Sequence, residues 1–169
     1  MSSYSRFLIS IAAVLVAGCG FHLRGSATLP FEVLYVEAPP GSLFGTQLRR
    51  IIGSSTKTRI TTDQVQADAT LQVVHELREK EIVALSAGGR VREFQLRYRV
   101  AYLLYDKKKS PLSPATEILL RRDFSFNDQD QLSKESEEAL LFRDMQTDAV
   151  QQLLRRLEAI PRALAKEKE

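Results

Sequence analysis

Alternation of apolar and polar residues between positions 91 and 105 restricts the fold of this chain more than any other feature of its sequence. The apolar positions are Phe94, Leu96, Tyr98, Val100, Tyr102 and Leu104. The polar positions between them include Glu93, Gln95, Arg97 and Arg99. Successive side chains of a β-strand point to opposite faces of the sheet, so this period of two predicts a long strand with one apolar and one polar face. The apolar face needs a covering layer from elsewhere in the chain.

Three other segments have the pattern of strands. Their ranges are residues 32–37, 69–85 and 117–126. The alternation in the second of them slips around residues 74–77, which indicates a β-bulge. Residues 86–90 predict a hairpin tip, because Gly88 and Gly89 adopt positive φ without steric cost. Three lysines and two prolines predict a loop over residues 107–114, and residues 58–61 resemble one further brief strand.

Two segments have apolar residues at helical spacing. In residues 42–53 these are Phe44, Leu48, Ile51 and Ile52, followed by Gly53 as a cap. A longer stripe runs through Leu141, Met145, Ala149, Leu153, Leu157 and Ile160. Ser133 is the expected N-cap of this second helix, and Pro161 marks its end. The expected fold is therefore α+β, with a mostly antiparallel four-stranded sheet and two helices packed on one of its faces.

The composition limits the classes of function that this chain can have. Its 169 residues suit one domain, and 24 Lys and Arg against 21 Asp and Glu leave a net charge of only +3, too small to indicate a nucleic-acid partner. The single cysteine excludes an intramolecular disulfide. With only two histidines besides it, few side chains are left for a metal site. We therefore expect no nucleic acid, no metal and no cofactor.

The N-terminus has the layout of a secretory signal peptide. Arg6 precedes an uncharged stretch over residues 7–17, which is too short to span a membrane as a helix of about 20 residues. A short buried helix is the alternative reading of this stretch. The following Val16-Ala17-Gly18-Cys19 resembles a bacterial lipobox, which implies cleavage before the cysteine and a lipid on its sulfur. The residue after this cysteine is Gly20. In lipoproteins of this kind an aspartate at that position favours retention at the inner membrane, so Gly20 implies that the protein is located at the outer membrane.

These features divide the chain into four parts. The parts are a signal peptide over residues 1–18, a lipidated N-terminal segment over 19–28, an α+β domain over 29–162 and a charged C-terminal tail over 163–169. Two or more acyl chains anchor a protein stably in a membrane, whereas one gives only marginal binding. The mature protein is therefore expected to stay in its membrane leaflet.

Cys19→Ala is expected to abolish lipidation and to slow removal of the signal peptide, because the chain contains no other thiol that can form the thioether. Intact-protein mass spectrometry of the mature protein measures this directly. Removal of residues 1–18 from the 169-residue chain leaves 151 residues. A wild-type mass equal to that of the unmodified 151-residue chain would show that Cys19 carries no lipid.

The segment after the lipobox, Cys19-Gly20-Phe21-His22-Leu23-Arg24-Gly25, resembles the start of the mature proteins of the LptE family. Further segments agree with that family in order and spacing, namely ADATL at 67–71, REFQL at 92–96 and RDFSFN at 122–127. The resemblance implies a lipoprotein that sits as a plug inside the β-barrel of LptD, as a heterodimer in the outer membrane. The pair delivers lipopolysaccharide to the outer leaflet.

The resemblance also implies site residues, each with a plainer alternative. Lipopolysaccharide carries phosphates, which favour Arg and Lys, so Arg90, Arg92 and Lys134 are candidates; the alternative is a solvated hairpin and a surface lysine. Phe21, His22, Leu23 and Arg24 either dock the anchor onto the domain or its partner, or cover the edge of the core and cap backbone carbonyls. The polar positions Glu93, Gln95, Arg97 and Arg99 are expected to face the barrel, because barrel interiors are polar.

Two other functions remain open from the sequence. One is another lipoprotein adaptor of a transport machine. The other is a lipid-anchored periplasmic hydrolase, for which His75 beside a serine and a carboxylate would be the minimum support. No phosphate-binding glycine motif is present, and no residue is a catalytic candidate, so we expect a protein that is not an enzyme.

Overall fold

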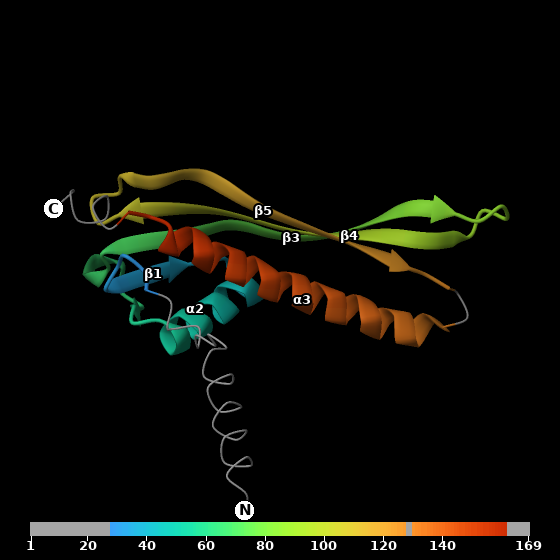
Figure 1. Cartoon of the computed structure of the whole chain (residues 1–169), viewed down its shortest axis with the longest axis horizontal. Helices are drawn as coiled ribbons and strands as arrows, with labels where there is room; N and C mark the ends of the chain where they lie inside the picture. The colour runs from blue at the N-terminus through green and yellow to red at the C-terminus, as the bar shows by residue number, and fades with distance from the viewer. Residues whose placement is uncertain (1–27, 128–129, 162–169) are drawn as a thin grey trace, which may run out of the picture.

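Three long antiparallel strands form most of the sheet in the computed structural model, which describes residues 28–127 and 130–161 (Figure 1). Two helices lie against one face of this sheet (Figure 1). In chain order the elements are β1 (Val33–Glu37), α2 (Leu43–Ser55), β2 (Arg59–Thr61), the 3-10 helix η1 (Gln64–Gln66), β3 (Ala69–Leu85), β4 (Val91–Asp106), β5 (Pro111–Ser125) and α3 (Gln131–Glu158). The signal peptide, the segment around Cys19 and the C-terminal tail lie outside the described residues.

The sheet has five strands in the order β2-β1-β3-β4-β5. The pairs β3–β4 and β4–β5 are antiparallel, whereas β1 is parallel to both β2 and β3. The α+β class and the two helices on one face are confirmed, but the prediction of four strands is wrong. The additional strand is β2, which lies within the brief strand predicted over residues 58–61 and joins the sheet by pairing with β1 over three residues.

The core lies between β4 and the two helices. The predicted apolar row of β4 is buried from Leu96 to Leu104, and its members are Leu96, Tyr98, Val100, Tyr102 and Leu104. The longer helical stripe meets this row through Met145, Ala149, Leu153 and Leu157, all of which are buried in the same apolar cluster. Burial of side chains of this size stabilises a fold by about 1.5–3 kcal/mol each. One continuous core therefore holds the whole described domain together.

A register shift in β3 changes which of its side chains face the helices. The shift lies between Val73 and His75, at the predicted bulge. Directly paired residues of antiparallel strands share a face, and the pairs Arg78↔Tyr98 and Lys80↔Leu96 therefore turn two cations toward the helices. Arg78 Nη2 donates to Gln146 Oε1 at 2.9 Å and Lys80 Nζ donates to Glu138 Oε2 at 2.6 Å. Beyond the bulge, the layer between β3 and α3 is thus polar.

Two local predictions are corrected. The loop expected over residues 107–114 ends at Ser110, because β5 already begins at Pro111. Both prolines of that segment lie in β5, which tolerates them because it is an edge strand whose outer backbone groups need no partner strand. Ser133 is not the N-cap of α3, since the cap position is Asp130 and the Ser133 hydroxyl donates to the Asp130 carbonyl at 2.9 Å.

Candidate functional site

The predicted anion-binding residues lie at one end of the molecule. The tip of the β3–β4 hairpin projects at this end, and the start of α3 lies at the same end without reaching the tip (Figure 1). Arg90 and Arg92 are exposed, and neither guanidinium takes part in an ion pair with another described residue. Gly89 has a φ of 77°, so only one of the two tip glycines uses the conformation for which both were expected. The hairpin therefore presents two cations to whatever approaches this end.

Lys134 lies at the same end but in a different environment. Its Nζ donates to Glu137 Oε2 at 2.8 Å and to Ser125 Oγ at 3.3 Å. The same Nζ lies 5.4 Å from the centre of the Phe124 ring, and the side chain is 18% exposed. An anion that binds Lys134 must therefore compete with the carboxylate of Glu137.

Lys80 is a cation at this end that the sequence analysis missed. Its Nζ lies 4.1, 5.6 and 5.8 Å from the ring centres of Phe94, Phe124 and Phe126, respectively. The three rings pack together, with Phe94 and Phe126 edge to face at 5.3 Å. Each such cation–π contact contributes about 0.5–1 kcal/mol at an exposed site. Lys80 and Lys134 thus both contact Phe124 and add two cations to the two arginines.

We call the surface formed by Glu79, Glu81, Gln95, Arg97, Arg99, Glu117 and Asp123 the polar face. It lies on the side of the sheet away from the helices. Gln95, Arg97 and Arg99 alternate along β4 with its buried row. The other members lie on β3 and β5 and pair with outward-facing positions of β4. Arg97 Nη1 donates to Glu81 Oε1 at 2.8 Å, and its Nε donates to Gln95 Oε1 at 3.1 Å. Arg99 Nη2 lies 3.5 Å from Glu79 Oε2, and Arg99 Nε lies 3.9 Å from Glu117 Oε1.

Gln95 extends this network across the strands, since its Nε2 donates to Asp123 Oδ1 on β5 at 3.1 Å. Glu93, the fourth predicted member of the row, pairs with Ser125 of β5 at the end of the same face. The structure thus places all four predicted residues on one face. Every charged side chain that takes part in this network has a partner of opposite charge or an amide. The polar face is nevertheless acidic, because its seven defined residues include four acids and two arginines.

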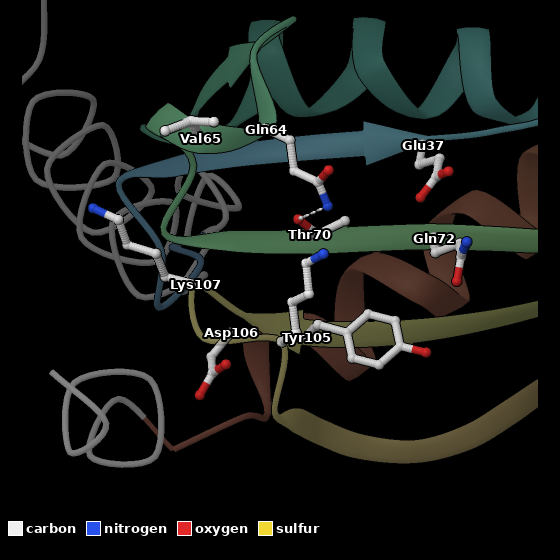
Figure 2. A pocket seen from close by; sticks show the side chains of 9 residues that line it. Glu37, Gln64, Val65, Thr70, Gln72, Tyr105, Asp106 and Lys107 are labelled. Carbon is white, nitrogen blue, oxygen red and sulfur yellow. Dashed lines mark hydrogen bonds between the residues drawn. The ribbon is translucent and has the colours of Figure 1, made fainter.

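A cleft of about 750 Å³ opens on this same side of the sheet, at the end opposite the hairpin tip (Figure 2). Thr70, Gln72 and Tyr105 form its floor, and Gln64 of η1 donates to Thr70 Oγ1 at 3.4 Å. Both acids and lysines line it, namely Glu37, Asp106, Lys107 and Lys109. This mixture of charges does not select one class of ligand.

The residues needed for catalysis do not come together in the described part of the chain. His75 Nε2 lies 3.9 Å from Glu117 Oε2 on the exposed side of the sheet, and no hydrogen bond joins it to a described serine. Within residues 28–127 and 130–161, no group of three or more His, Cys, Asp and Glu side chains is placed to hold a metal ion. None of the described helices is both long and apolar enough to cross a membrane.

The sequence of this chain matches one known protein family over most of its length. The sequence profile of LptE, described as lipopolysaccharide-assembly, matches residues 31–157, from just before β1 to the last turn of α3. The chain belongs to the LptE family. A relative from Pectobacterium atrosepticum, named LPS-assembly lipoprotein LptE, is 27% identical over 158 residues, covering 89% of this chain and 82% of the relative. A relative of the same name from Photorhabdus laumondii is 26% identical over 154 residues, which again cover 89% of this chain and 82% of the relative.

Solved structures agree with this LptE-family fold. The solution NMR structure of an uncharacterized lipoprotein B from Nitrosomonas europaea is 45% identical, with a TM-score of 0.74, and the match covers 83% of this chain and 91% of that chain. A minor lipoprotein from Acinetobacter baumannii, solved by crystallography, shares the fold at 19% identity and a TM-score of 0.62, over 76% of this chain and 91% of its own.

Membership of the LptE family makes this chain a lipopolysaccharide-assembly lipoprotein and not an enzyme. Among the predicted site residues, the structure brings Arg90, Arg92 and Lys134 to one end and Glu93, Gln95, Arg97 and Arg99 to one face. Cys19 and the segment from Phe21 to Arg24 lie outside the described residues. Their roles as lipid acceptor and docking segment stay predictions.

Proposed function

We propose that this protein is anchored in the outer membrane through a lipid on Cys19 and that its domain occupies the lumen of the LptD β-barrel as a heterodimer. In this arrangement it scaffolds and plugs the barrel and assists the assembly of lipopolysaccharide into the outer leaflet. The short segment from Phe21 to Arg24 connects the anchor to the domain and docks against the domain or the barrel. Family membership and the names of the relatives support the role in lipopolysaccharide assembly.

The polar face is the observation that supports the position inside a barrel. The lumen of an outer-membrane barrel is lined by polar side chains, so a plug needs a surface that can exchange hydrogen bonds with such a lining. Arg97, Arg99 and Gln95 offer donors across the width of the polar face, and each is only partly buried. Their present partners are exposed carboxylates, which contribute about 0–1 kcal/mol per pair and are readily exchanged for partners in a barrel wall.

The end of the molecule that carries Arg90, Arg92, Lys80 and Lys134 suits the proposed role in lipopolysaccharide assembly. Phosphate groups of lipopolysaccharide are recognised best by guanidinium and ammonium groups in charge-assisted hydrogen bonds. Arg90 and Arg92 have no described ion-pair partner, whereas Lys80 on β3 and Lys134 on α3 are paired with Glu138 and Glu137, respectively. We propose that Arg90, Arg92 and Lys134 contact lipopolysaccharide as it passes the plug.

Co-purification is the experiment that tests this function. The full-length lipoprotein, extracted from cells in mild detergent and isolated by an affinity tag, is expected to bring with it a barrel protein that mass spectrometry identifies as LptD. Recovery of a different transport assembly in its place would support the alternative of another lipoprotein adaptor.

Arg97→Asp is expected to lower the amount of co-purified barrel several-fold, because it places a carboxylate opposite Glu79 and beside Glu81 on the polar face. The free energy of unfolding should change by no more than about 1 kcal/mol, since the lost ion pair is partly exposed. Lys57→Asp is the matched control, because it makes the same change of charge at an exposed position between α2 and β2. Equal barrel recovery with Arg97→Asp and Lys57→Asp would contradict a barrel contact through the polar face.

A further inference from the structure

The cleft at the end opposite the hairpin tip, shown in Figure 2, contains a buried carboxylate that is only half satisfied. Asp106 lines this cleft and is only 6% exposed. Its Oδ1 accepts from the backbone N–H of Ser110 at 2.7 Å, whereas its Oδ2 is buried without a hydrogen-bond partner. A buried carboxylate oxygen without a donor is costly, so this atom indicates a ligand that brings a cation to the cleft.

The cleft also offers an apolar contact. Val65 of η1 lies on its rim and is 78% exposed, and the ring of Tyr105 forms part of its floor (Figure 2). The other charged residues that line it are Glu37, Lys107 and Lys109. Two acids and two lysines balance each other, so the unpartnered oxygen and the apolar rim select the ligand rather than the net charge. A suitable ligand carries a cation next to an apolar side chain.

The described part of the chain begins beside this cleft. Leu34 of β1 pairs with Ala69 of β3, and Ala69 pairs on its other side with Asp106 of β4. Two strand spacings, about 10 Å, therefore separate β1 from Asp106. Arg24 precedes Leu34 by ten residues, which span up to about 33 Å when they are extended. The chain before β1 is thus long enough to bring the guanidinium of Arg24 to Asp106.

The segment before β1 has the composition that this cleft requires. Residues 20–27 contain no acid, and they place apolar side chains directly beside cationic or titratable ones in the order Phe21, His22, Leu23, Arg24. The C-terminal tail, residues 163–169, is the other part of the chain outside the described domain that could be considered. It combines two lysines with two glutamates and has no aromatic residue, so it suits an apolar rim and an unpartnered carboxylate less well.

We infer that residues 21–24 occupy this cleft, with the guanidinium of Arg24 donating to Asp106 Oδ2 and the apolar side chains of the segment covering Val65. This inference rests on the proposed function, in which the segment docks against the domain or the barrel; it selects the domain and names the site. The lipid anchor then leaves the domain at a fixed place, opposite the hairpin tip. The chain itself thereby sets how the sheet is oriented relative to the membrane, before any barrel is bound.

The test attaches a nitroxide spin label to Cys19, the only thiol of the chain, in residues 19–169 produced without the signal peptide so that Cys19 carries no lipid. NMR spectroscopy is expected to show strong paramagnetic broadening of the amide signals of Gln64, Val65 and Thr70. Arg24→Glu should lower the ratio of docked to undocked segment at least about tenfold, because it removes a charge-assisted hydrogen bond and adds repulsion. The broadening in the cleft should fall accordingly.

Two further variants complete this experiment. Asp106→Asn removes the charge but keeps an oxygen that accepts from the Ser110 N–H, and it should reduce the broadening as Arg24→Glu does. The double variant should lose little more than either single variant, because the two residues act as one pair. Lys57→Glu is the matched control, since it makes the same change of charge as Arg24→Glu at an exposed position outside the cleft. It should broaden the cleft signals like the parent.

Three outcomes would overturn the inference. The first is equal broadening of the cleft signals in Arg24→Glu and the parent. The second is stronger broadening of the polar face than of the cleft in the parent. The third is that a label at residue 166, introduced as Lys166→Cys with Cys19→Ala, broadens the cleft signals more than the label on Cys19, which would assign the cleft to the C-terminal tail. Failure of the proposed function is seen separately, as the absence of LptD from the co-purification.

Discussion

Tyr98→Asp is expected to lower the free energy of unfolding by about 3–5 kcal/mol, enough to unfold most of a marginally stable domain. Tyr98 is fully buried, and its hydroxyl donates to Glu76 Oε1 at 2.7 Å. Burial raises the pKa of this hydroxyl far above its ordinary value, and the hydrogen bond to Glu76 raises it further, so the tyrosine is neutral. An aspartate at this position would bring a second carboxyl group against Glu76 in a buried site.

Urea unfolding of the mature chain with Cys19→Ala, followed by circular dichroism, measures this loss. Tyr98→Phe is the matched variant, because it removes only the hydroxyl and should cost about 1–2 kcal/mol. Arg97→Asp, one position along the strand on the polar face, should cost no more than about 1 kcal/mol. Equal losses for Tyr98→Asp and Arg97→Asp would mean that both faces of the sheet are buried in the isolated protein.

Tyr98 has this large effect because Glu76 joins three parts of the fold. The Ser42 hydroxyl donates to Glu76 Oε2 at 2.7 Å, and the Phe44 backbone N–H donates to the same oxygen at 3.3 Å. Glu76 therefore caps the start of α2, where unpaired backbone N–H groups favour a carboxylate. Substitution of Tyr98 disturbs the contact between α2 and the sheet as well as the core itself.

The sequence was sufficient to predict those parts of the fold in which a periodic pattern is compatible with only one kind of element and one buried side. The alternation around Tyr98 predicted the buried row of β4, and the stripe from Met145 to Leu157 predicted the covering helix, because each apolar set must be buried on one side. The start of β5 was missed because proline interrupts most strands, and only the topology shows that Pro111 and Pro114 lie on an edge.

The candidate site was predicted only in part for a similar reason. The sequence predicted the hairpin tip that carries Arg90 and Arg92, and the start of α3, which carries Lys134, lies at the same end of the molecule (Figure 1). Lys80 was missed because a bulge shifts the register of β3, and a shift of one residue moves a side chain to the other face. Its three aromatic neighbours come from β4, from the end of β5 and from the residue just after β5, which no local pattern connects.

The combined variant R90D/R92D/K134D is expected to bind lipopolysaccharide at least about 100-fold more weakly than the parent chain. Charge-assisted hydrogen bonds contribute about 1.5–3 kcal/mol each, so the loss of two is sufficient for this change, and the new carboxylates repel phosphate. Lys134 should contribute less than the arginines, because Glu137 already occupies its Nζ at 2.8 Å. The arginines have no such described partner, so R90D/R92D should account for most of the effect.

Titration of the unlipidated mature chain with purified lipopolysaccharide at low and moderate salt measures this affinity. The control K57D/R59D/K107D makes the same change in net charge at three exposed positions near the opposite end of the sheet. Contacts with phosphates weaken as salt screens them, so the gap between the two variants should narrow at the higher salt concentration. Equal affinities of R90D/R92D/K134D and the parent, with unchanged melting curves, would show that these cations are solvated surface and that the protein acts in lipopolysaccharide assembly through the barrel alone.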